Sequence, residues 1–416
     1  MIAFVSFAEL RGGAAKSACK FYRACLKIGV AADYLVVEKN SHAPDVISPG
    51  RWAYSFHFFK RVIAHFLQWL QWEGGEGKHS LNIFGCSFVV RRMKKYSYVH
   101  LHWINNEVIS LEQLAKIKAR LVITLHDEWF YCGSEHLAMD SVRPFEGYWS
   151  TNKNVKGLDW DRITWERKRR ALLAIKDRVI FTAPSKWLAV RAQNSKLLSE
   201  FNIRLVPNFV DTEVFSRKTD FGRSLFGAEV KPADDVILFG AVHGKNMKLK
   251  GFHILHEALL LLAKQLNCQK NIVVVSFGGQ AGTSRTDFGF RHVEVGPIAD
   301  AAQLALLYSR ATVTIVPSLV ESFGQVAAES LACETPVVAF NCSGLAEVVE
   351  HRVGGYLASP FSAESLCEGM HWLLTMGGDN IRNMGQSGRQ HILENFSEAR
   401  VMERLLNVYR EHGMGL

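Results

Sequence analysis

The stretch TVTIVPSLVESFGQVAAESLACETPVVAF (residues 312–340) decides the fold class. It begins with a short apolar run at 312–317 that is rich in β-branched residues, turns at Gly324 and continues as a helical pattern at 324–332. A second apolar run follows at 335–340. Two strands that are joined by a helix are expected to pair in parallel, because parallel strands need such a crossover. The stretch therefore predicts a βαβ unit of an α/β domain.

The same alternation of strand and helix runs through the whole chain. Further strands are expected at 2–6, 32–37, 96–103, 120–126, 178–183, 203–206, 235–242, 271–277, 291–296 and 355–358, and helices at 14–28, 164–176, 252–266, 300–309 and 343–350. The pattern loosens between Asp211 and Asp235. We therefore expect two doubly wound, Rossmann-like domains, 1–210 and 211–416, with a last helix at about 397–413 packing back on the first domain.

Composition limits the class of protein and its partners. The 416 residues are 48% hydrophobic and 21% charged, which is enough apolar material for sizeable cores. The net charge of +9 favours phosphate-bearing or acidic partners. The eight cysteines form no Cys-x-x-Cys pair, so we expect reduced, mostly buried thiols in a cytosolic protein.

The chain offers no signal for secretion or for crossing a membrane. Charged residues follow the first apolar run at once, at Glu9 and Arg11, so a signal-peptide core has no room. No apolar run reaches the roughly 20 residues of a spanning helix. We expect a cytoplasmic protein, with any membrane contact made from the surface, on the inner face of the cytoplasmic membrane.

Two glutamates flank the turn of the opening stretch. Glu321 is expected in the loop ahead of the helix, and Glu329 more than one turn inside it. Backbone N–H groups from Gly324 to Val326 offer an anion site at the helix start, and the carboxylates can accept hydrogen bonds from sugar hydroxyls. From these residues alone a second interpretation stays open: Glu321 caps the helix, and Glu329 is a solvated helix residue.

Glu321 and Glu329 match the E-x7-E signature of family 4 glycosyltransferases, which are retaining enzymes of the two-domain GT-B fold. Other segments resemble further motifs of that family, and the resemblance covers nearly the whole chain. They are Arg11-Gly-Gly13, Thr124-Leu-His126-Asp127, Val206-Pro-Asn208-Phe-Val-Asp211-Thr-Glu-Val-Phe215 and Lys250-Gly-Phe252, with His100-Leu-His102-Trp-Ile-Asn105 and Pro184-Ser-Lys-Trp187 resembling the colanic acid and exopolysaccharide branch. The resemblance implies two Rossmann-like domains facing each other across a cleft.

The resemblance also implies roles for individual residues. Glu329 is expected to hold the ribose hydroxyls, Glu321 to lie beside the donor sugar, and Lys250 to neutralise the departing diphosphate. His126 is expected to contact a donor-sugar hydroxyl; a buried strand-end histidine bonded to backbone is the alternative. The remaining donor-binding residues expected from the resemblance are Gly12, Gly13, Lys245, Ser322, Phe323, Gly324, Gln325 and Val326.

The sequence leaves an alternative open for the two glycines, and it departs from the family pattern before Lys250. Gly12 and Gly13 would let backbone approach the diphosphate, since a Cβ would obstruct it, but a plain turn is the alternative. The family usually has an arginine a few residues before the lysine of K-G-F, and this chain has none. Lys245, Lys248 or His243 is left to replace it, and a lysine lacks the bidentate fork of arginine.

The implied function is a retaining glycosyltransferase. It would move a sugar from a UDP- or GDP-sugar, held mainly on 211–416, to a glycan or lipid-linked acceptor on 1–210, in exopolysaccharide, O-antigen or related glycan synthesis. The enzymatic alternatives are a GT-B sugar-nucleotide epimerase and a phosphorylase. A basic nucleic-acid-binding protein is the non-enzymatic one, but no RNA-binding motif is recognisable, so no nucleic-acid partner is expected.

No metal and no other cofactor is expected. Asp159-Trp-Asp161 fits the Asp-x-Asp pattern of metal-dependent glycosyltransferases, but it adjoins a basic stretch, Arg162 to Arg170, and is interpreted as two solvated aspartates at a helix start. In a GT-B enzyme, Lys250 and the helix dipole can supply the positive charge that assists the leaving group.

The segment 51–72 combines aromatic residues and cations with apolar positions at helical spacing, at Phe59, Ile63, Phe66 and Leu70. We favour a helix that faces the core of the first domain. An amphipathic helix on a membrane surface has the same pattern, and the cations at 91–95 add positive charge nearby. Peripheral contact with an anionic membrane is therefore the second interpretation.

Overall fold

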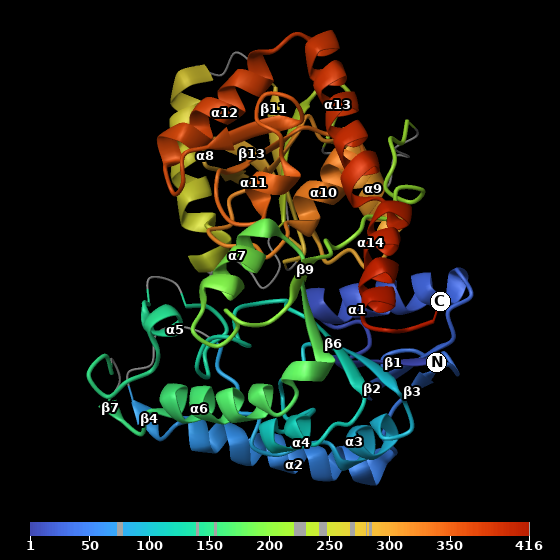
Figure 1. The fold of residues 1–416 in the computed structure, drawn as a ribbon. Coiled ribbons are helices and arrows are strands. Elements are labelled where there is room, and N and C mark those ends of the chain that lie inside the picture. The colour runs from blue at the N-terminus through green and yellow to red at the C-terminus, as the bar shows by residue number, and fades with distance from the viewer. Residues whose placement is uncertain are drawn as a thin grey trace. The chain divides into compact units, whose positions relative to one another are not determined.

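The computed structural model of the protein describes residues 1–415 except 73–77, 139–140, 154–155, 220–229, 241–247, 267–270, 280 and 283–284. The chain divides into two compact units. Unit 1 holds residues 1–206 and 402–416, and unit 2 holds residues 207–401 (Figure 1).

Unit 1 is built on a parallel sheet whose strand order is β3-β2-β1-β5-β6-β8-β9. Its strands are β1 (Ile2–Ala8), β2 (Ala32–Glu38), β3 (Val46–Ile47), β5 (Tyr98–His102), β6 (Arg120–Thr124), β8 (Val179–Ala183) and β9 (Ile203–Leu205). All residues of β1 are buried, as expected for a strand with both faces covered. In the parallel register, Ile2 lies opposite Ala32 on one side and Tyr98 on the other.

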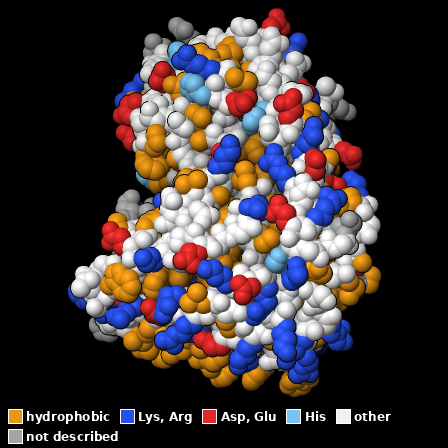
Figure 2. All heavy atoms as spheres, viewed as in Figure 1, with side chains coloured by type: hydrophobic (Ala, Val, Ile, Leu, Met, Phe, Trp, Pro, Cys, Tyr) orange, Lys and Arg blue, Asp and Glu red, His pale blue; other side chains and the backbone are white. Residues whose placement is uncertain are grey.

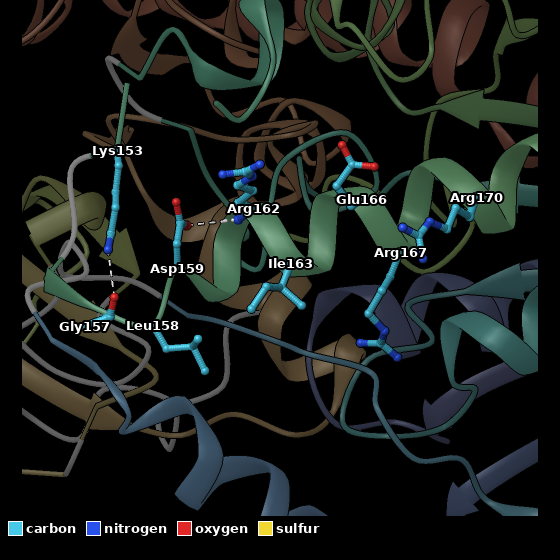
Figure 3. A pocket seen from close by; sticks show the side chains of 9 residues that line it. All are labelled: Lys153, Gly157, Leu158, Asp159, Arg162, Ile163, Glu166, Arg167 and Arg170. Atoms are coloured by element: carbon cyan, nitrogen blue, oxygen red, sulfur yellow. Dashed lines mark hydrogen bonds between the residues drawn. The ribbon is translucent and has the colours of Figure 1, made fainter. Parts of the chain in front are cut away.

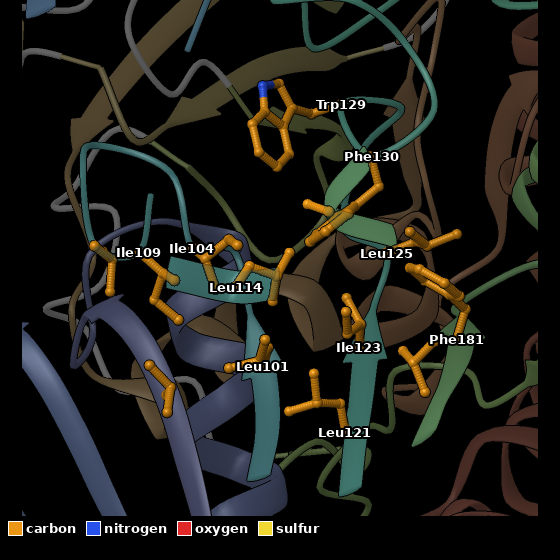
Figure 4. Close-up of a cluster of buried hydrophobic side chains, with 14 of the residues drawn as sticks. Leu101, Ile104, Ile109, Leu114, Leu121, Ile123, Leu125, Trp129, Phe130 and Phe181 are labelled. Atoms are coloured by element: carbon orange, nitrogen blue, oxygen red, sulfur yellow. The ribbon is translucent and has the colours of Figure 1, made fainter. Parts of the chain in front are cut away.

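Helices connect these strands. They are α1 (Gly13–Lys27), α2 (Arg51–Gln68), α3 (Ser87–Met93), α4 (Leu111–Ala115), α5 (Arg143–Glu146), α6 (Trp160–Leu173), the 3-10 turn η1 (Lys176–Arg178) and α7 (Lys186–Asn194). A short antiparallel pair, β4 (Gln71–Trp72) with β7 (Lys156–Gly157), lies outside the main sheet. Unit 1 has one apolar cluster, which contains Leu101, Leu121, Ile123 and Phe181 of the strands together with Trp129 (Figure 4).

Unit 2 repeats this plan with the strand order β12-β13-β11-β10-β14-β15-β16. The strands are β10 (Asp235–Gly240), β11 (Ile272–Phe277), β12 (Arg285–Asp287), β13 (Phe290–Gly296), β14 (Val313–Val316), β15 (Val337–Phe340) and β16 (Gly355–Ala358). The edge strand β12 pairs antiparallel with β13, and the other described pairings are parallel.

Helices cover both faces of the second sheet. They are the 3-10 turn η3 (Lys248–Lys250), α8 (Phe252–Leu266), α9 (Ala301–Arg310), α10 (Gln325–Ala332), α11 (Leu345–Val348), α12 (Ala363–Thr375) and α13 (Gly378–Phe396). The helices α8 and α12 pack on each other over one core, and α10 packs against α9 and α13 over the other (Figure 1). The expected α/β class, with two parallel sheets, is confirmed.

The last helix, α14 (Glu398–Glu411), begins in unit 2, and from Met402 onward the chain belongs to unit 1. Its C-terminal half is tied to the first sheet. The Tyr409 hydroxyl lies 2.8 Å from Nδ1 of His100, and Arg204 forms an ion pair with Glu411 at 2.9 Å. The two ends of the chain therefore complete the same unit.

Each sheet reverses its winding direction at one point. In unit 1 the order changes between β1 and β5, and in unit 2 between β10 and β14. Ligands of doubly wound sheets bind beyond the carboxyl ends of strands at such a switch point. A ligand is therefore expected near the segments after β1 and β5, and near those after β10 and β14.

Candidate functional site

The loop between β14 and α10 is shaped by a glycine in a left-handed conformation. Gly324 caps the start of α10 with φ 107° and ψ 52°. A Cβ at this position would lie 2.8 Å from Cδ2 of Leu345, so a larger residue would be both strained and crowded. The first N–H groups of a helix have no partner within the helix. Gly324 thus makes the turn that leads from the loop after β14 into α10.

The backbone of Glu321 is held by the segment that follows β15. Its N–H donates to the Ser343 hydroxyl at 3.0 Å, and its carbonyl accepts from the Gly344 N–H at 2.8 Å. A Cβ on Gly344 would lie 2.8–2.9 Å from the backbone of Glu321, Ser322 and Phe323. Ser343 and Gly344 therefore fix the loop, a role that their distance in sequence from Glu321 did not reveal.

Lys250 reaches the same loop from the end of η3. Its Nζ lies 2.5 Å from Oε1 of Glu321, and the two side chains are 41% and 22% exposed. Its neighbour Gly251 has φ 65°, and a Cβ there would lie 1.8 Å from the carbonyl oxygen of Pro317. The Leu319 N–H also donates to the Leu249 carbonyl at 2.9 Å. Backbone contacts thus pin Lys250 beside the carboxylate of Glu321.

This ion pair contributes little to folding, because partly exposed pairs are worth about 0–1 kcal/mol. Its position is more informative than its strength. Lys250 follows β10 and Glu321 follows β14, so the pair lies at the switch point of the second sheet. A cation that is held weakly there can exchange its carboxylate partner for a phosphate oxygen.

Glu329 is buried, with 8% of its surface exposed, so the alternative of a solvated helix residue is wrong. Its Oε1 accepts from Nε2 of Gln325 at 3.0 Å, and its Oε2 accepts from the buried Tyr308 hydroxyl at 3.4 Å. Burial raises the pKa of Tyr308 well above its usual value, and the negative charge of Glu329 adds to that rise. The hydroxyl is therefore protonated and donates to the carboxylate.

The other loop residues that are expected to bind the sugar donor are either partly exposed or buried. Ser322, Gln325 and Val326 are partly exposed. Phe323 is buried and packs edge-on against Phe396 with ring centroids 5.3 Å apart, so only its backbone can face a ligand. The structure brings residues 321–326, Glu329 and Lys250 together in unit 2. Lys245 lies outside the described residues, as does His243.

In unit 1, Gly12 follows β1 and caps the start of α1. Its φ is 91°, which favours glycine, and a Cβ added at Gly12 or Gly13 would have no neighbour within 4 Å. The space in front of these two residues is therefore open to a ligand. The neighbouring Arg11 is bound to Glu38 at 2.7 Å.

His126 lies two residues beyond β6, and its ring contacts a second histidine. Its Nε2 is 2.9 Å from Nδ1 of His102, at the end of β5. Burial lowers the pKa of His126 to about 4 and that of His102 well below its usual value. Both rings are therefore neutral at pH 7. A neutral His126 can offer a hydrogen bond but no positive charge.

Asp127, the next residue, is held by three donors. The Trp103 indole donates at 3.0 Å and the Trp129 backbone N–H at 3.0 Å, while Nδ1 of His136 lies 2.6 Å away. Burial alone would raise the pKa of Asp127, but the charge and hydrogen bond of His136 hold it at about 2. The ionised Asp127 thus fixes the loop that carries His126.

The interpretation of Asp159 and Asp161 as two solvated aspartates is wrong for both, because their side chains are only 11% and 8% exposed. Asp159 caps α6 and binds Arg143 at 2.7 Å, and Asp161 accepts hydrogen bonds from Ser134 and Gln71. Burial would raise the pKa of Asp161, but the hydrogen bonds of His79 and Ser134 lower it overall. The prediction failed because the sequence shows only that the two aspartates lie at the start of a helix. It does not show which residues pack on that helix.

A groove of about 510 Å³ lies beside α6 and is lined by basic and acidic side chains (Figure 3). Its cations include Arg162 and Arg170, and its acids are Asp159, which caps α6, and Glu166, which pairs with Arg169 at 3.0 Å. The groove contains no residue expected to bind the donor. Within the described part of the chain, no cluster of three histidine, cysteine or acidic side chains could hold a metal ion.

Residues 234–391, most of unit 2, match the family model described as "Glycosyl transferases group 1". The chain is 32% identical over 197 residues to a D-inositol 3-phosphate glycosyltransferase of Thermobifida fusca, a match that spans 43% of this chain and 43% of that protein. It is 24% identical over 397 residues to an uncharacterised glycosyltransferase of Methanocaldococcus jannaschii, covering 89% of this chain and 90% of that one.

Solved structures resemble the chain over nearly its full length. Sucrose-phosphate synthase from Thermosynechococcus elongatus has a TM-score of 0.66 at 18% identity and covers 99% of this chain and 98% of its own. The Anabaena protein HepE, solved with UDP and glucose, has a TM-score of 0.62 at 16% identity and covers 98% and 99%. The two parallel α/β domains and these neighbours are consistent with the GT-B fold. The family match is confined to residues 234–391, and the match to the Thermobifida fusca relative covers less than half of that protein.

Proposed function

We propose that this protein is a retaining glycosyltransferase that transfers a sugar from a nucleotide-sugar donor to a glycan or lipid-linked acceptor. The observation that carries the proposal is the pair of Lys250 and Glu321, 2.5 Å apart beside the start of α10. A cation and helix N–H groups suit a diphosphate, and a neighbouring carboxylate suits sugar hydroxyls. HepE, a structural neighbour, has been solved with UDP-glucose.

In this proposal, different residues would contact different parts of the nucleotide-sugar donor. Glu329 would accept hydrogen bonds from the ribose, while Lys250 and the start of α10 would neutralise the diphosphate. Glu321 would orient the sugar. Ser322, Gln325 and Val326 would line this part of the site, and Lys245 would add a second cation. On unit 1, Gly12 and Gly13 would leave room for the diphosphate, and the neutral His126 would hydrogen bond to a sugar hydroxyl.

The reaction then needs no protein-bound intermediate. The bond between the anomeric carbon and the diphosphate breaks, and the acceptor oxygen bonds to the same face of the sugar. The acceptor proton passes to the leaving phosphate oxygen. Fixed charges that face the developing negative charge stabilise such a transition state.

The acceptor follows from the proposed pathway class: a glycan or a lipid-linked sugar of exopolysaccharide, O-antigen or related glycan synthesis. Several relatives are named for D-inositol 3-phosphate, so a phosphorylated alcohol is the second candidate for the acceptor. It is placed second because the first of these matches spans only 43% of that relative. Assembly on a lipid carrier would place the enzyme in the cytoplasm, at the inner face of the membrane. The seven described cysteines are all free, as in a reducing compartment.

A thermal-shift screen tests the proposed donor. Among UDP-, GDP- and ADP-sugars, we expect one nucleotide class to stabilise the protein, by about 2.7 kcal/mol at 100 times its dissociation constant. The matching free nucleotide diphosphate serves as the control, because it shares every contact except those of the sugar. Turnover of that donor without an acceptor would indicate an epimerase instead. A requirement for pyridoxal phosphate would indicate a phosphorylase, and stabilisation by nucleic acid alone would exclude the proposal.

We expect chelation to leave turnover intact. The positive charge at the leaving diphosphate is assigned to Lys250 and the start of α10, neither of which EDTA removes. Initial rates before and after EDTA treatment measure this, and readdition of Mg²⁺ or Mn²⁺ is the control. A complete loss of activity that either metal restores would contradict the assignment and would give Asp159 and Asp161 a role in the reaction.

A further inference from the structure

The helix α2 turns its apolar face to solvent, so the favoured interpretation of a core-facing helix is wrong. The residues that recur at helical spacing on one stripe are Trp52, Phe56, Phe59, Ile63, Phe66 and Leu70. The largest of them are well exposed: Trp52 by 91%, Phe56 by 61% and Phe66 by 62%. Trp69, the residue that caps the helix, is 78% exposed. Scattered exposed apolar residues are ordinary, but a continuous aromatic stripe indicates an interaction surface.

The opposite face of α2 is polar, and it binds the domain. Nε2 of His57 lies 3.1 Å from the Asn106 carbonyl, and Lys60 donates to the Gly85 carbonyl at 3.0 Å. Near the other end, Gln68 donates to the His79 carbonyl at 3.1 Å. Turning the helix over would break these bonds and bury polar groups without partners, which costs about 1–3 kcal/mol for each group. The outward direction of the stripe is therefore fixed by the fold.

The charge around the stripe is positive. The 18 residues of α2 contain no aspartate or glutamate, and Arg51 at its start is exposed, whereas Lys60 donates to the Gly85 carbonyl and Arg61 pairs with Glu38 at 3.4 Å. The following helix α3 has no acid either, and it adds Arg91 and Arg92, followed by Lys94 and Lys95. In Figure 1, α2 and α3 lie along the same lower edge of unit 1, and Figure 2 shows hydrophobic and basic side chains gathered along that edge.

We propose that the aromatic stripe of α2 is a membrane-docking surface, which lies in the plane of a bilayer with anionic headgroups. Tryptophans prefer the boundary between headgroups and acyl chains, and Trp52 and Trp69 mark the two ends of the helix, about 25 Å apart at 1.5 Å per residue. The phenylalanines between them enter the acyl boundary, while the exposed cations Arg51, Arg91, Lys94 and Lys95 meet lipid phosphates. The proposal rests on this surface and does not depend on the assigned reaction.

Two features favour lipid over a second copy of the chain. A two-fold dimer would bring the same patch of each copy together, and this patch would then oppose cations with cations. An anionic bilayer provides both the apolar layer and the opposite charge. Among the described residues, no helix is long and apolar enough to cross a membrane.

Sedimentation of the full chain with vesicles tests the proposal. We expect at least tenfold stronger binding to phosphatidylcholine vesicles that contain phosphatidylglycerol than to phosphatidylcholine alone, because each cation near the surface contributes about fivefold. The preference should shrink at high salt. The double variant Phe56→Ser with Phe66→Ser should lose at least tenfold in binding to the anionic vesicles.

The matched control is Leu173→Ser with Val190→Ser, which removes two side chains of similar exposure, 54% and 57%, from elsewhere in unit 1. It should bind vesicles like the wild type. All the replaced residues are exposed, and circular dichroism and thermal unfolding check that each variant is folded. Equal binding to neutral and anionic vesicles, no binding at all, or equal losses in both variants would overturn the proposal. So would a dimer in light scattering that only the α2 variant dissociates.

Discussion

Replacing Glu321 by alanine is expected to reduce turnover at saturating donor by about a hundredfold or more, the loss typical of a preorganised group that acts on the transition state. Ser343 and Gly344 hold the backbone of Glu321, so the carboxylate is already positioned before the reaction begins. Nucleotide diphosphate should bind almost normally to Glu321→Ala. The variant removes only the carboxylate that pairs with Lys250, and it leaves the cation and the start of α10 in place.

Initial rates at saturating donor measure the first effect, and calorimetry with the nucleotide diphosphate measures the second. Glu394→Ala is the matched control, because Glu394 is an exposed glutamate of the same unit that bonds to Gln390 on its own helix. Near-native turnover in Glu321→Ala would mean that this carboxylate only stabilises the loop and pairs with Lys250, without acting on the sugar. The sugar site would then have to lie elsewhere.

Glu329→Ala is expected to weaken binding of the nucleotide sugar and of the free nucleotide alike, by about 10- to 150-fold. This range corresponds to the loss of a charged hydrogen bond of about 1.5–3 kcal/mol. Turnover at saturating donor should fall less, because the ribose lies away from the bond that breaks. Calorimetry with the nucleotide diphosphate, compared between Glu329→Ala and Glu394→Ala, checks this prediction.

Folding has to be separated from binding in this variant. Glu329 is buried and accepts from the Tyr308 hydroxyl at 3.4 Å, so its loss leaves a buried donor without this partner, at a cost of about 1–3 kcal/mol of stability. Thermal unfolding measures that cost, and Glu329→Gln keeps the shape and one acceptor oxygen. If Glu329→Ala lost turnover and Glu321→Ala lost affinity, the site would stand but the two roles would be exchanged.

The fold class could be predicted from the sequence because its signal is local. Runs of β-branched residues such as 312–317 and 335–340 form β14 and β15, and the pattern between them forms α10. The turn at Gly324 was also visible, because a helix start after a strand needs a sharp change of direction. The roles of Glu321, Glu329 and Lys250 in donor binding stay predictions.

The support of the site could not be predicted, since it depends on residues that are distant in sequence. Ser343 holds the backbone of Glu321 from 22 positions away. Nothing in the segment 342–344 records that the loop after β14 lies against it. Gly251 was noticed as part of a motif, but its close approach to Pro317 follows only from the positions of β10 and β14 as neighbours in the sheet.

The sequence by itself determined that the segment 51–72 has the pattern of an amphipathic helix and that the chain alternates strands and helices, because both properties follow from the spacing of apolar residues along the backbone. Only the tertiary structure decided which face of α2 meets solvent, that Asp161 is buried, and that Lys250 meets Glu321. Periodicity shows which side chains share a face. The direction of that face depends on which partners the rest of the chain supplies: hydrogen bonds of His57, Lys60 and Gln68 hold the polar face of α2 inward, and the aromatic stripe is left outside.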